Sequence, residues 1–233
     1  MDLYDAIFIR RSVRKYDLTP LDQAAVRGIV DFTDSAPQLA GQRATFAAVS
    51  GAEVSDNSAP HYLLAFSPEG DSAYANVGYV MQRADLHIQS LGLGSHWMAM
   101  GKPKGEWADR DPYCAWLAFG RTDEPARGGE ADFKRLPIAK ISAEDNPVAR
   151  AARVAPSGMN NQPWRLEFAD GLVRLVHVPR GAMKVWTKKK SDKLSLGIAA
   201  RHVELALAHG GKTVESVTPA DRAGAFAIEI AYR

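Results

Sequence analysis

Three arginines and a serine occupy five consecutive positions near the N-terminus, in Arg10-Arg11-Ser12-Val13-Arg14. Like charges this close repel one another unless an anion lies among them. The planar guanidinium group matches two phosphate oxygens at once, and a serine hydroxyl adds a further donor. The pattern suits a phosphate-binding turn, but taken alone it fits a basic turn that only water covers at least as well.

A second polar segment lies far along the chain, at residues 156–164, Pro-Ser-Gly-Met-Asn-Asn-Gln-Pro-Trp. Its prolines and glycine favour a tight, exposed backbone, while Asn160 and Gln162 offer amide donors and acceptors. Such a loop is suited to lie against a flat, polar ring. The alternative is an ordinary helix-to-strand connection in which Trp164 is buried.

These two segments fall in two copies of one repeated unit. Pro37 and Pro156 are 119 positions apart, and the same offset links Gly78 to Gly197 and Gly92 to Gly211. The copies have diverged in complementary ways, since copy one keeps the arginine motif and copy two keeps the Asn-Gln-Pro-Trp segment. We therefore expect one binding site to which each half contributes one part.

The second, pseudo-symmetric site should be empty of ligand. Copy two lacks the arginines, and copy one has Gly41, Arg43, Ala44 and Thr45 where copy two has Asn160, Gln162, Pro163 and Trp164.

The elements that must position these residues follow from apolar spacing and from Gly and Pro signals. In the first half we predict helices at 2–10, 21–32 (with Thr19 as N-cap and Pro20 in the first turn) and 74–91, and strands at 45–49, 62–66, 94–101 and 115–120. In the second half we predict helices at 147–154 and 196–208, a basic loop at 184–193, and strands at 164–168, 172–178 and 225–231.

The order of elements repeats and mixes helices with strands, which predicts an α+β fold of two tandem half-repeats. The boundary is predicted near residue 140, with a first repeat at 1–140 and a shorter, intimately packed repeat at 141–233. The helices at 74–91 and 196–208 are apolar on most sides, which is typical of buried helices. We expect them to pack on each other across a pseudo-twofold axis, as in an isologous dimer.

Together the motifs resemble the FMN-dependent nitroreductase family. Residues 10–16 match its Arg-x-Ser-x-Arg/Lys-x-aromatic motif, and residues 155–164 match its Pro-Ser-x-x-Asn-x-Gln-Pro-Trp motif. Residues 92–97 match its Gly-Leu-Gly-x-x-Trp segment, and Phe119-Gly120 with Arg135-Leu136-Pro137 match the end of its core. Ordinary members are homodimers with both motifs on every subunit, so this chain resembles a two-repeat, single-chain variant that forms an intramolecular pseudo-dimer.

The resemblance implies roles for individual residues. Arg10, Arg11 and Ser12 would hold the FMN phosphate and ribityl chain, with Arg135 and Lys134 closing on the phosphate. Arg14 would approach the pyrimidine side of the isoalloxazine, where a cation stabilises the reduced flavin. The second half would contribute Pro156, Ser157, Gly158 and Asn160, and Met98, Ala99 and Met100 would face the flavin edge at N5 and O4.

The resemblance also implies an activity, namely an oxidoreductase that passes hydride from NAD(P)H to a small electron-poor aromatic or quinone-like acceptor. Flavin chemistry requires little general acid–base help from protein, so no catalytic side chain is assigned. The alternative is a protein of the same fold that binds flavin, or serves as a structural protein, without turnover.

Composition limits the kinds of partner, metal site and location that the protein can have. The net charge is +2, which argues against nucleic acid as a partner, and 46% of the residues are apolar, which is ordinary for a globular protein. The one cysteine, Cys114, lies in an apolar run, and the six histidines show no spacing typical of metal ligands. No segment suits a signal peptide or a membrane span, so we expect a cytoplasmic monomer that acts as a pseudo-dimer on a small-molecule substrate.

Overall fold

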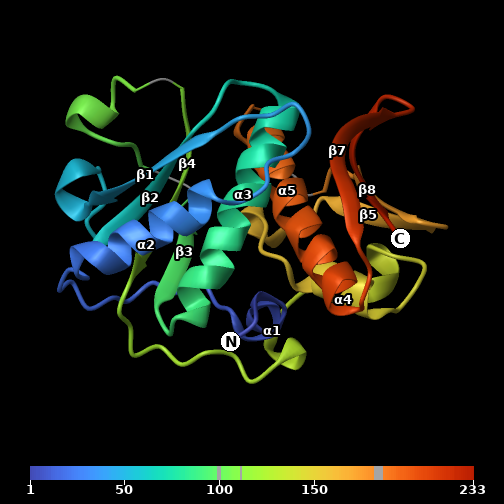
Figure 1. Ribbon diagram of the computed structural model, residues 1–233, viewed down its shortest axis with the longest axis horizontal. Coiled ribbons are helices and arrows are strands. Elements are labelled where there is room, and N and C mark those ends of the chain that lie inside the picture. The colour runs from blue at the N-terminus through green and yellow to red at the C-terminus, as the bar shows by residue number, and fades with distance from the viewer. Residues whose placement is uncertain (99–100, 111, 181–185) are drawn as a thin grey trace.

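The computed structural model describes residues 1–98, 101–110, 112–180 and 186–233. Two long helices cross at the centre, and a four-stranded sheet lies on either side of them (Figure 1). The first half contains α1 (Leu3–Ile9), α2 (Gln23–Asp34), β1 (Thr45–Ser50), β2 (His61–Phe66), α3 (Asp71–Ser90), β3 (Gly94–Met98) and β4 (Tyr113–Gly120). The second half contains α4 (Pro147–Val154), β5 (Trp164–Ala169), β6 (Leu172–His177), α5 (Trp186–His209), β7 (Val214–Arg222) and β8 (Ala225–Tyr232).

The two sheets have the same topology. Their strand orders are β1-β2-β4-β3 and β5-β6-β8-β7, and every neighbouring pair is antiparallel. Each half therefore uses a long helix followed by an edge strand, then a strand that returns to the middle of the sheet. The prediction of an α+β fold with two tandem halves is confirmed.

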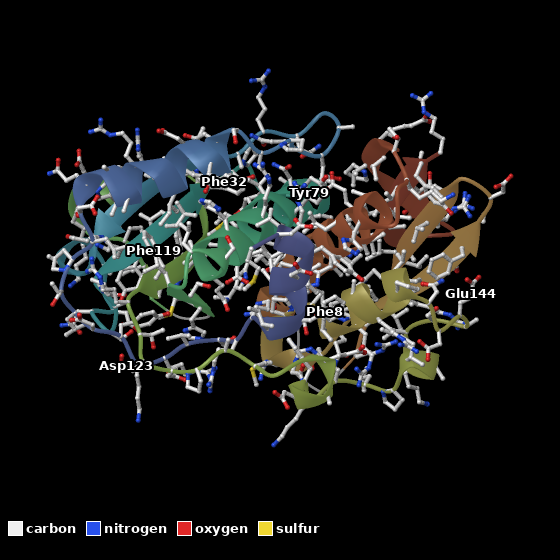
Figure 2. The ribbon with its side chains drawn as sticks, turned by 60° about the horizontal axis from the view of Figure 1, so that its bottom comes forward. Phe8, Phe32, Tyr79, Phe119, Asp123 and Glu144 are labelled. Atoms are coloured by element: carbon white, nitrogen blue, oxygen red, sulfur yellow. The ribbon has the colours of Figure 1, made fainter. Side chains whose placement is uncertain are left out.

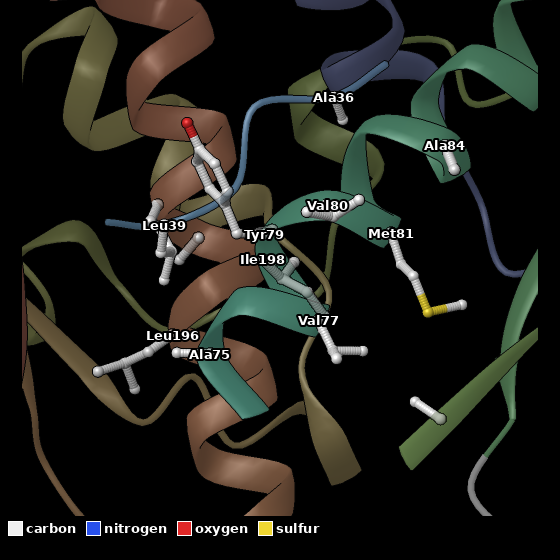
Figure 3. Close-up of a cluster of buried hydrophobic side chains, with 14 of the residues drawn as sticks. Ala36, Leu39, Ala75, Val77, Tyr79, Val80, Met81, Ala84, Leu196 and Ile198 are labelled. Carbon is white, nitrogen blue, oxygen red and sulfur yellow. The ribbon is translucent and has the colours of Figure 1, made fainter. Parts of the chain in front are cut away.

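The core lies where α3 packs on α5. Thirteen of the twenty residues of α3 are buried, because its apolar side chains meet a sheet on one side and α5 on the other (Figure 3). Strand β2 is buried on both faces, while β5 alternates buried and exposed residues because water covers its outer face. Figure 2 shows side chains filling the space between these layers, Tyr79 and Phe119 among them.

Two glycines allow the central helices to approach closely. A Cβ added at Gly78 would lie 2.0 Å from the carbonyl oxygen of Leu194, and one added at Gly197 would lie 1.8 Å from that of Ala75. Leu194 is 119 positions after Ala75, as Gly197 is after Gly78, so the two contacts are mates under the pseudo-twofold axis. The offset seen in the sequence is thus the symmetry of the core.

Hydrogen bonds repeat at the same offset. The amide of Leu39 donates to Asn76 Oδ1 at 2.9 Å, and the amide of Gly158 donates to Ser195 Oγ at 3.1 Å. Likewise Arg83 Nη1 lies 3.0 Å from the carbonyl of Phe32, and His202 Nδ1 lies 2.8 Å from that of Ala151. Each partner of one bond is 119 positions from its counterpart, so the duplication extends from backbone to side-chain contacts.

Adding a methyl group at either crossing glycine should destabilise the fold strongly. We expect Gly78→Ala and Gly197→Ala each to lower the free energy of unfolding by about 3 kcal/mol, because the added Cβ meets rigid backbone. Urea denaturation measures the effect. Gly28→Ala in α2 is the control, since nothing lies within 4 Å of its added Cβ, and it should raise stability by about 0.5–1 kcal/mol. Equal effects at all three positions would contradict the close crossing.

Three details of the predicted elements are wrong. Helix α2 begins later than predicted, because Asp22 and not Thr19 is its N-cap and accepts a hydrogen bond from the amide of Ala25. Residues 186–193, predicted to lie in a basic loop, form the first turns of α5, while Lys184 and Val185 lie outside the described residues. Strand β7 was not predicted, because Pro219 and several charged residues interrupt its pattern. As an edge strand it tolerates a proline.

Among the described residues, no helix is long and apolar enough to cross a membrane. The same part of the chain holds no group of three or more His, Cys, Asp or Glu side chains placed to share a metal ion.

Candidate functional site

The arginine motif lies along the free edge of the first sheet. Ser12 forms a parallel bridge with Ser95 of β3, and the amide of Val13 donates to the Ser95 carbonyl at 3.0 Å. The side chain of Arg14 is exposed. Burial lowers the pKa of His96 in β3, and the positive charge of Arg14 acts in the same direction. The motif is therefore fixed beside β3, whose last residue, Met98, is another predicted flavin contact.

Arg10 points inward from this edge and is anchored to a buried carboxylate. Only 1% of Arg10 is exposed, and its Nε donates to Asp85 Oδ2 at 2.9 Å. Asp85, fully buried on α3, also accepts from the side chains of Gln82, Gln89 and Ser95. Four donors compensate the burial of this charge and fix the plane of the Arg10 guanidinium.

Two buried guanidinium nitrogens lack an acceptor within the described part of the chain. They are Nη2 of Arg10 and Nε of Arg135. Burial and, after it, the neighbouring charges of Arg10, Arg127 and Arg153 together lower the pKa of Arg135 to about 10. Buried donors without acceptors are costly. An anion between these arginines would accept from them and relieve their repulsion, so the residues present fit the phosphate of FMN.

Arg135 also joins the arginine cluster to the second polar segment. Its Nη1 donates to Asn160 Oδ1 at 2.7 Å, and its Nη2 donates to the carbonyl of Val154 at 3.2 Å. The amide group of Asn160 in turn donates to the carbonyl of Lys134 at 2.9 Å, while the side chain of Lys134 is exposed. The predicted contributions of the two halves therefore meet at Arg135 and Asn160.

The segment from Pro156 to Gln162 forms a strained elbow. Met159, Asn160 and Gln162 have φ angles of 52°, 57° and 47°, which residues other than glycine rarely adopt. Gln162 is buried and holds this conformation, because it accepts from the amide of Leu136 and donates to the carbonyl of Asn160. Strain of this kind is concentrated at functional sites.

Other predicted elbow residues attach it to α5. Pro156 is buried, and the hydroxyl of Ser157 accepts from the amide of Gln162 at 3.0 Å. A Cβ at Gly158 would lie 1.9 Å from Ser191 Oγ, so a larger residue there would require the Ser191 hydroxyl to rotate away. The elbow is thus supported from both sides, by residues 134–136 and by the start of α5.

Two residues predicted to contact FMN, Arg11 and Met98, do not lie with the arginines of the phosphate cluster. The side chain of Arg11 points away from Arg10, to Glu124 at 3.1 Å and to the carbonyl of Pro125 at 2.8 Å. Met98 ends β3 and packs with Trp116 on the outer face of the first sheet. Ala99 and Met100 lie outside the described residues. The FMN contacts of Arg11, Met98, Ala99 and Met100 stay predictions.

A buried network that the sequence analysis missed connects these parts. Gln82 Oε1 accepts from Trp97 Nε1 at 3.2 Å, and Gln82 Nε2 lies 3.1 Å from both Asp85 and His202 Nε2. His202 of α5 is fully buried, and its Nδ1 faces a carbonyl, so Nδ1 carries the proton and Nε2 accepts. The available signal was Gln82, Asp85 and Gln89, which form a polar stripe on an otherwise apolar helix.

His202 should make the fold sensitive to acid. Its pKa is lowered to about 3, mainly by burial and to a lesser extent by the charges of Arg10 and Arg135, while the hydrogen bond to the Ala151 carbonyl and the charge of Asp85 oppose the shift. Because the unfolded chain binds this proton near pH 6.5, the contribution is complete above pH 6.5 and is lost as the pH falls towards 3. Urea denaturation across this range should show a loss on the order of 4 kcal/mol. His202→Gln should flatten the profile, and His209→Gln, at a half-exposed site, should leave it unchanged.

Protein side chains fill the counterpart of the phosphate cluster. Arg201 and Glu204 stand at the positions equivalent to Gln82 and Asp85, and they pair with each other. Arg201 also donates to the carbonyls of Tyr79 and Pro37, and the amide of Ala40 donates to the carbonyl of Val217 in β7. The first-half elbow, residues 37–43, therefore rests directly on β7, and Arg201 bridges this elbow and α3.

Comparison with known proteins agrees with this architecture. A family model described as "Putative TM nitroreductase" matches residues 2–207, and the chain belongs to this nitroreductase family. A crystal structure of a "putative nitroreductase" from Thermotoga maritima msb8 has the same fold, with a TM-score of 0.73 and 17% identity, over 99% of this chain and 94% of that one.

Weaker matches are to shorter chains. A nitroreductase family protein from Clostridium difficile 630 is 18% identical over 63% of this chain and 99% of that one, with a TM-score of 0.48. A protein from Bacteroides thetaiotaomicron VPI-5482, described as "Putative NADH dehydrogenase/NAD(P)H nitroreductase", is 20% identical over 62% and 98%, with a TM-score of 0.46. A search of curated proteins gave no match.

Proposed function

We propose that the chain is an FMN-dependent oxidoreductase that passes hydride from NAD(P)H to a small electron-poor aromatic or quinone-like acceptor. It binds one FMN, between the arginine motif of the first half and the elbow of the second. Membership of the nitroreductase family supports the reaction class.

One observation carries the proposal, namely the two buried guanidinium nitrogens without an acceptor at the junction of the halves. Arg10 Nη2 and Arg135 Nε belong to different segments and are both desolvated, as a phosphate site requires. Asp85 neutralises part of the positive charge on Arg10. The positive charge without a neighbouring carboxylate is therefore mainly that of Arg135.

The role of the residues of the chain is to bind and orient FMN. Arg10 and Arg135 hold the phosphate, with Ser12 and the exposed Lys134 closing around the phosphate and ribityl chain. Arg11 joins them only if its side chain leaves Glu124. Arg14 places a positive charge near the pyrimidine edge, and the elbow residues Pro156, Ser157, Gly158 and Asn160 cover the ring from the second half. FMN, when bound, supplies the hydride chemistry between NAD(P)H and the acceptor. Water supplies the proton that the acceptor takes up.

The first experiment is to purify the protein after reconstitution with FMN and to measure flavin per chain. We expect a yellow monomer with about one FMN per chain, bleached by NAD(P)H without oxygen and recoloured by a quinone. Asn160→Ala should weaken FMN binding although it lies in the second half. Yellow protein that NAD(P)H does not bleach would establish the alternative, a flavin protein without turnover. Colourless protein that cannot be reconstituted would refute both.

A further inference from the structure

A hollow of about 680 Å³ lies away from the phosphate cluster, at the end of the molecule where α3 and α5 begin. We call it the hairpin hollow, because residues of the β7–β8 hairpin line one side of it. Figure 1 shows where this hairpin lies in the fold. Residues of both halves line it: Asp71, Ser72, His177, Pro179, Lys189, Lys193, Pro219, Ala220, Asp221, Gly224, Ala225 and Phe226. Its volume is within the range of small-molecule sites.

A buried lysine defines the chemistry of this hollow. Lys193 is 4% exposed, and its Nζ lies 3.3 Å from Asp71 Oδ2, 3.2 Å from His177 Nδ1 and 4.8 Å from the centre of the Phe226 ring. Because an ammonium group only donates, His177 accepts at Nδ1 and turns its Nε2 proton to Asp192, 3.1 Å away. Among the described residues, two of the three N–H groups of Lys193 have an acceptor, which leaves one for a ligand.

The pseudo-twofold axis explains why a hollow exists there. The turns after α3 and α5 are equivalent, since Leu93 donates to Ile88 and Lys212 donates to Leu207, each pair 119 positions apart. The far end of β7 therefore corresponds to the far end of β3, where the flavin ring is proposed to lie. The hollow thus occupies the ring end of the second pseudo-site.

The helix residues at the hollow follow the same equivalence. Lys193 and Asp71 stand where the other half has Tyr74 and Lys190, and Lys190 Nζ lies 5.3 Å from the centre of the Tyr74 ring. Each contact joins the two halves, so a cation–aromatic contact at one pseudo-site replaces an ion pair at the other. The second half has acquired a buried ammonium group at a position where the first half has an aromatic ring.

The lining selects both the shape and the charge of an occupant. Arg201 and Glu204 fill the phosphate end, so FMN does not fit, but a single flat ring does. Phe226, Pro179 and Pro219 supply apolar surface for that ring, and Lys193 and Lys189 supply positive charge. Asp71 and Asp221 limit the negative charge that can enter, which favours one carboxylate over two.

We propose that the hairpin hollow is a second ligand site, which binds a small aromatic monocarboxylate with its carboxylate on Lys193 and its ring against Phe226. This site is separate from the proposed flavin site and does not require flavin to be bound.

Titration calorimetry with benzoate tests the proposal, with benzamide and phthalate as neutral and doubly charged probes. We expect one benzoate to bind per chain. Benzamide and phthalate should bind about tenfold more weakly, because benzamide has no negative charge and phthalate has two. Lys193→Met should weaken benzoate by at least about tenfold. Lys189→Met, at an exposed position, should weaken it about threefold and carries no risk to folding.

Matched controls separate this site from the flavin site. Lys190→Met is the nearest control, because Lys190 is on the same helix but lies over Tyr74 and Tyr113 instead of lining the hollow. It should leave benzoate binding unchanged, as should prior loading with FMN. Equal affinity for benzoate and benzamide, or equal losses in the Lys189 and Lys190 variants, would overturn the proposal. Displacement of benzoate by FMN would place the probe in the flavin site, and absence of saturable binding would also refute the hollow as a site.

Discussion

Arg135→Met is expected to raise the Kd for FMN by about 100-fold. The substitution removes a charge-assisted hydrogen bond to the phosphate, and such bonds contribute about 1.5–3 kcal/mol. It also removes the bond between Arg135 and Asn160 that holds the elbow to the first half. The quenching of FMN fluorescence during titration of the apoprotein measures the change. High salt should weaken the wild type more than the variant, because only the wild type retains the full positive charge.

Arg43→Met is the control for this experiment. Arg43 lies in the first-half elbow at the position equivalent to Gln162, and it is exposed. We expect less than a twofold change in the Kd for FMN, since the phosphate end of that pseudo-site is filled by Arg201. Equal losses in the two variants would show that the chain does not concentrate its phosphate contacts at Arg135.

Asp85→Asn should be the most destabilising single change at the site. The carboxylate is fully buried and accepts from Arg10, Gln82, Gln89 and Ser95. An asparagine side chain turns one of the two acceptor oxygens into a donor, which leaves Arg10 as an uncompensated buried charge. Breaking a buried pair in this way costs about 3–5 kcal/mol, which urea denaturation of the apoprotein would detect.

The equivalent residue of the other half provides the comparison. Glu204 pairs with Arg201, but its side chain is 18% exposed, so water can compensate the loss of charge. We expect Glu204→Gln to lower the free energy of unfolding by about 1 kcal/mol or less. Added inorganic phosphate should restore part of the stability lost in Asp85→Asn, because it would take the place of the missing charge beside Arg10. Similar losses in both variants, with no effect of phosphate, would contradict the role given to Asp85.

Features of the fold that depend on local pattern could be predicted from the sequence. Helix α3 is apolar around most of its circumference, and Asn146-Pro147 gives α4 a clear start, so both were located closely. The offset between Gly78 and Gly197 indicated the repeat, and the apolar character of the two helices indicated that they pack together. The structure adds that both glycines lie where the two backbones approach most closely.

The errors arose where tertiary contacts overrule local signals. The first turns of α5 are rich in lysine and were predicted to be a loop, yet Lys193 is buried by its contacts with Asp71 and His177. Strand β7 pairs with β8 at eight positions although Pro219 lies within it, because one side of an edge strand needs no partner.

At the site, the sequence indicated residue types better than contacts. The proximity of Arg135 to Asn160 could be expected from the family resemblance, whereas the anchoring of Arg10 by Asp85 could not. Asp85, Gln82 and His202 lie on helices whose apolar pattern suggested only core packing. Their polar side chains meet because α3 and α5 cross at this point. The spacing of residues within one helix does not indicate which residues of another helix they will contact.

The covalent connection between the two halves has a consequence for assembly. In a homodimer, an interfacial pocket disappears when dilution separates the subunits, and its two copies must carry identical residues. Here the α3–α5 crossing is intramolecular, so its integrity does not vary with protein concentration. Each of the two pseudo-sites is also encoded by its own codons, so the residues of one can change while those of the other stay the same.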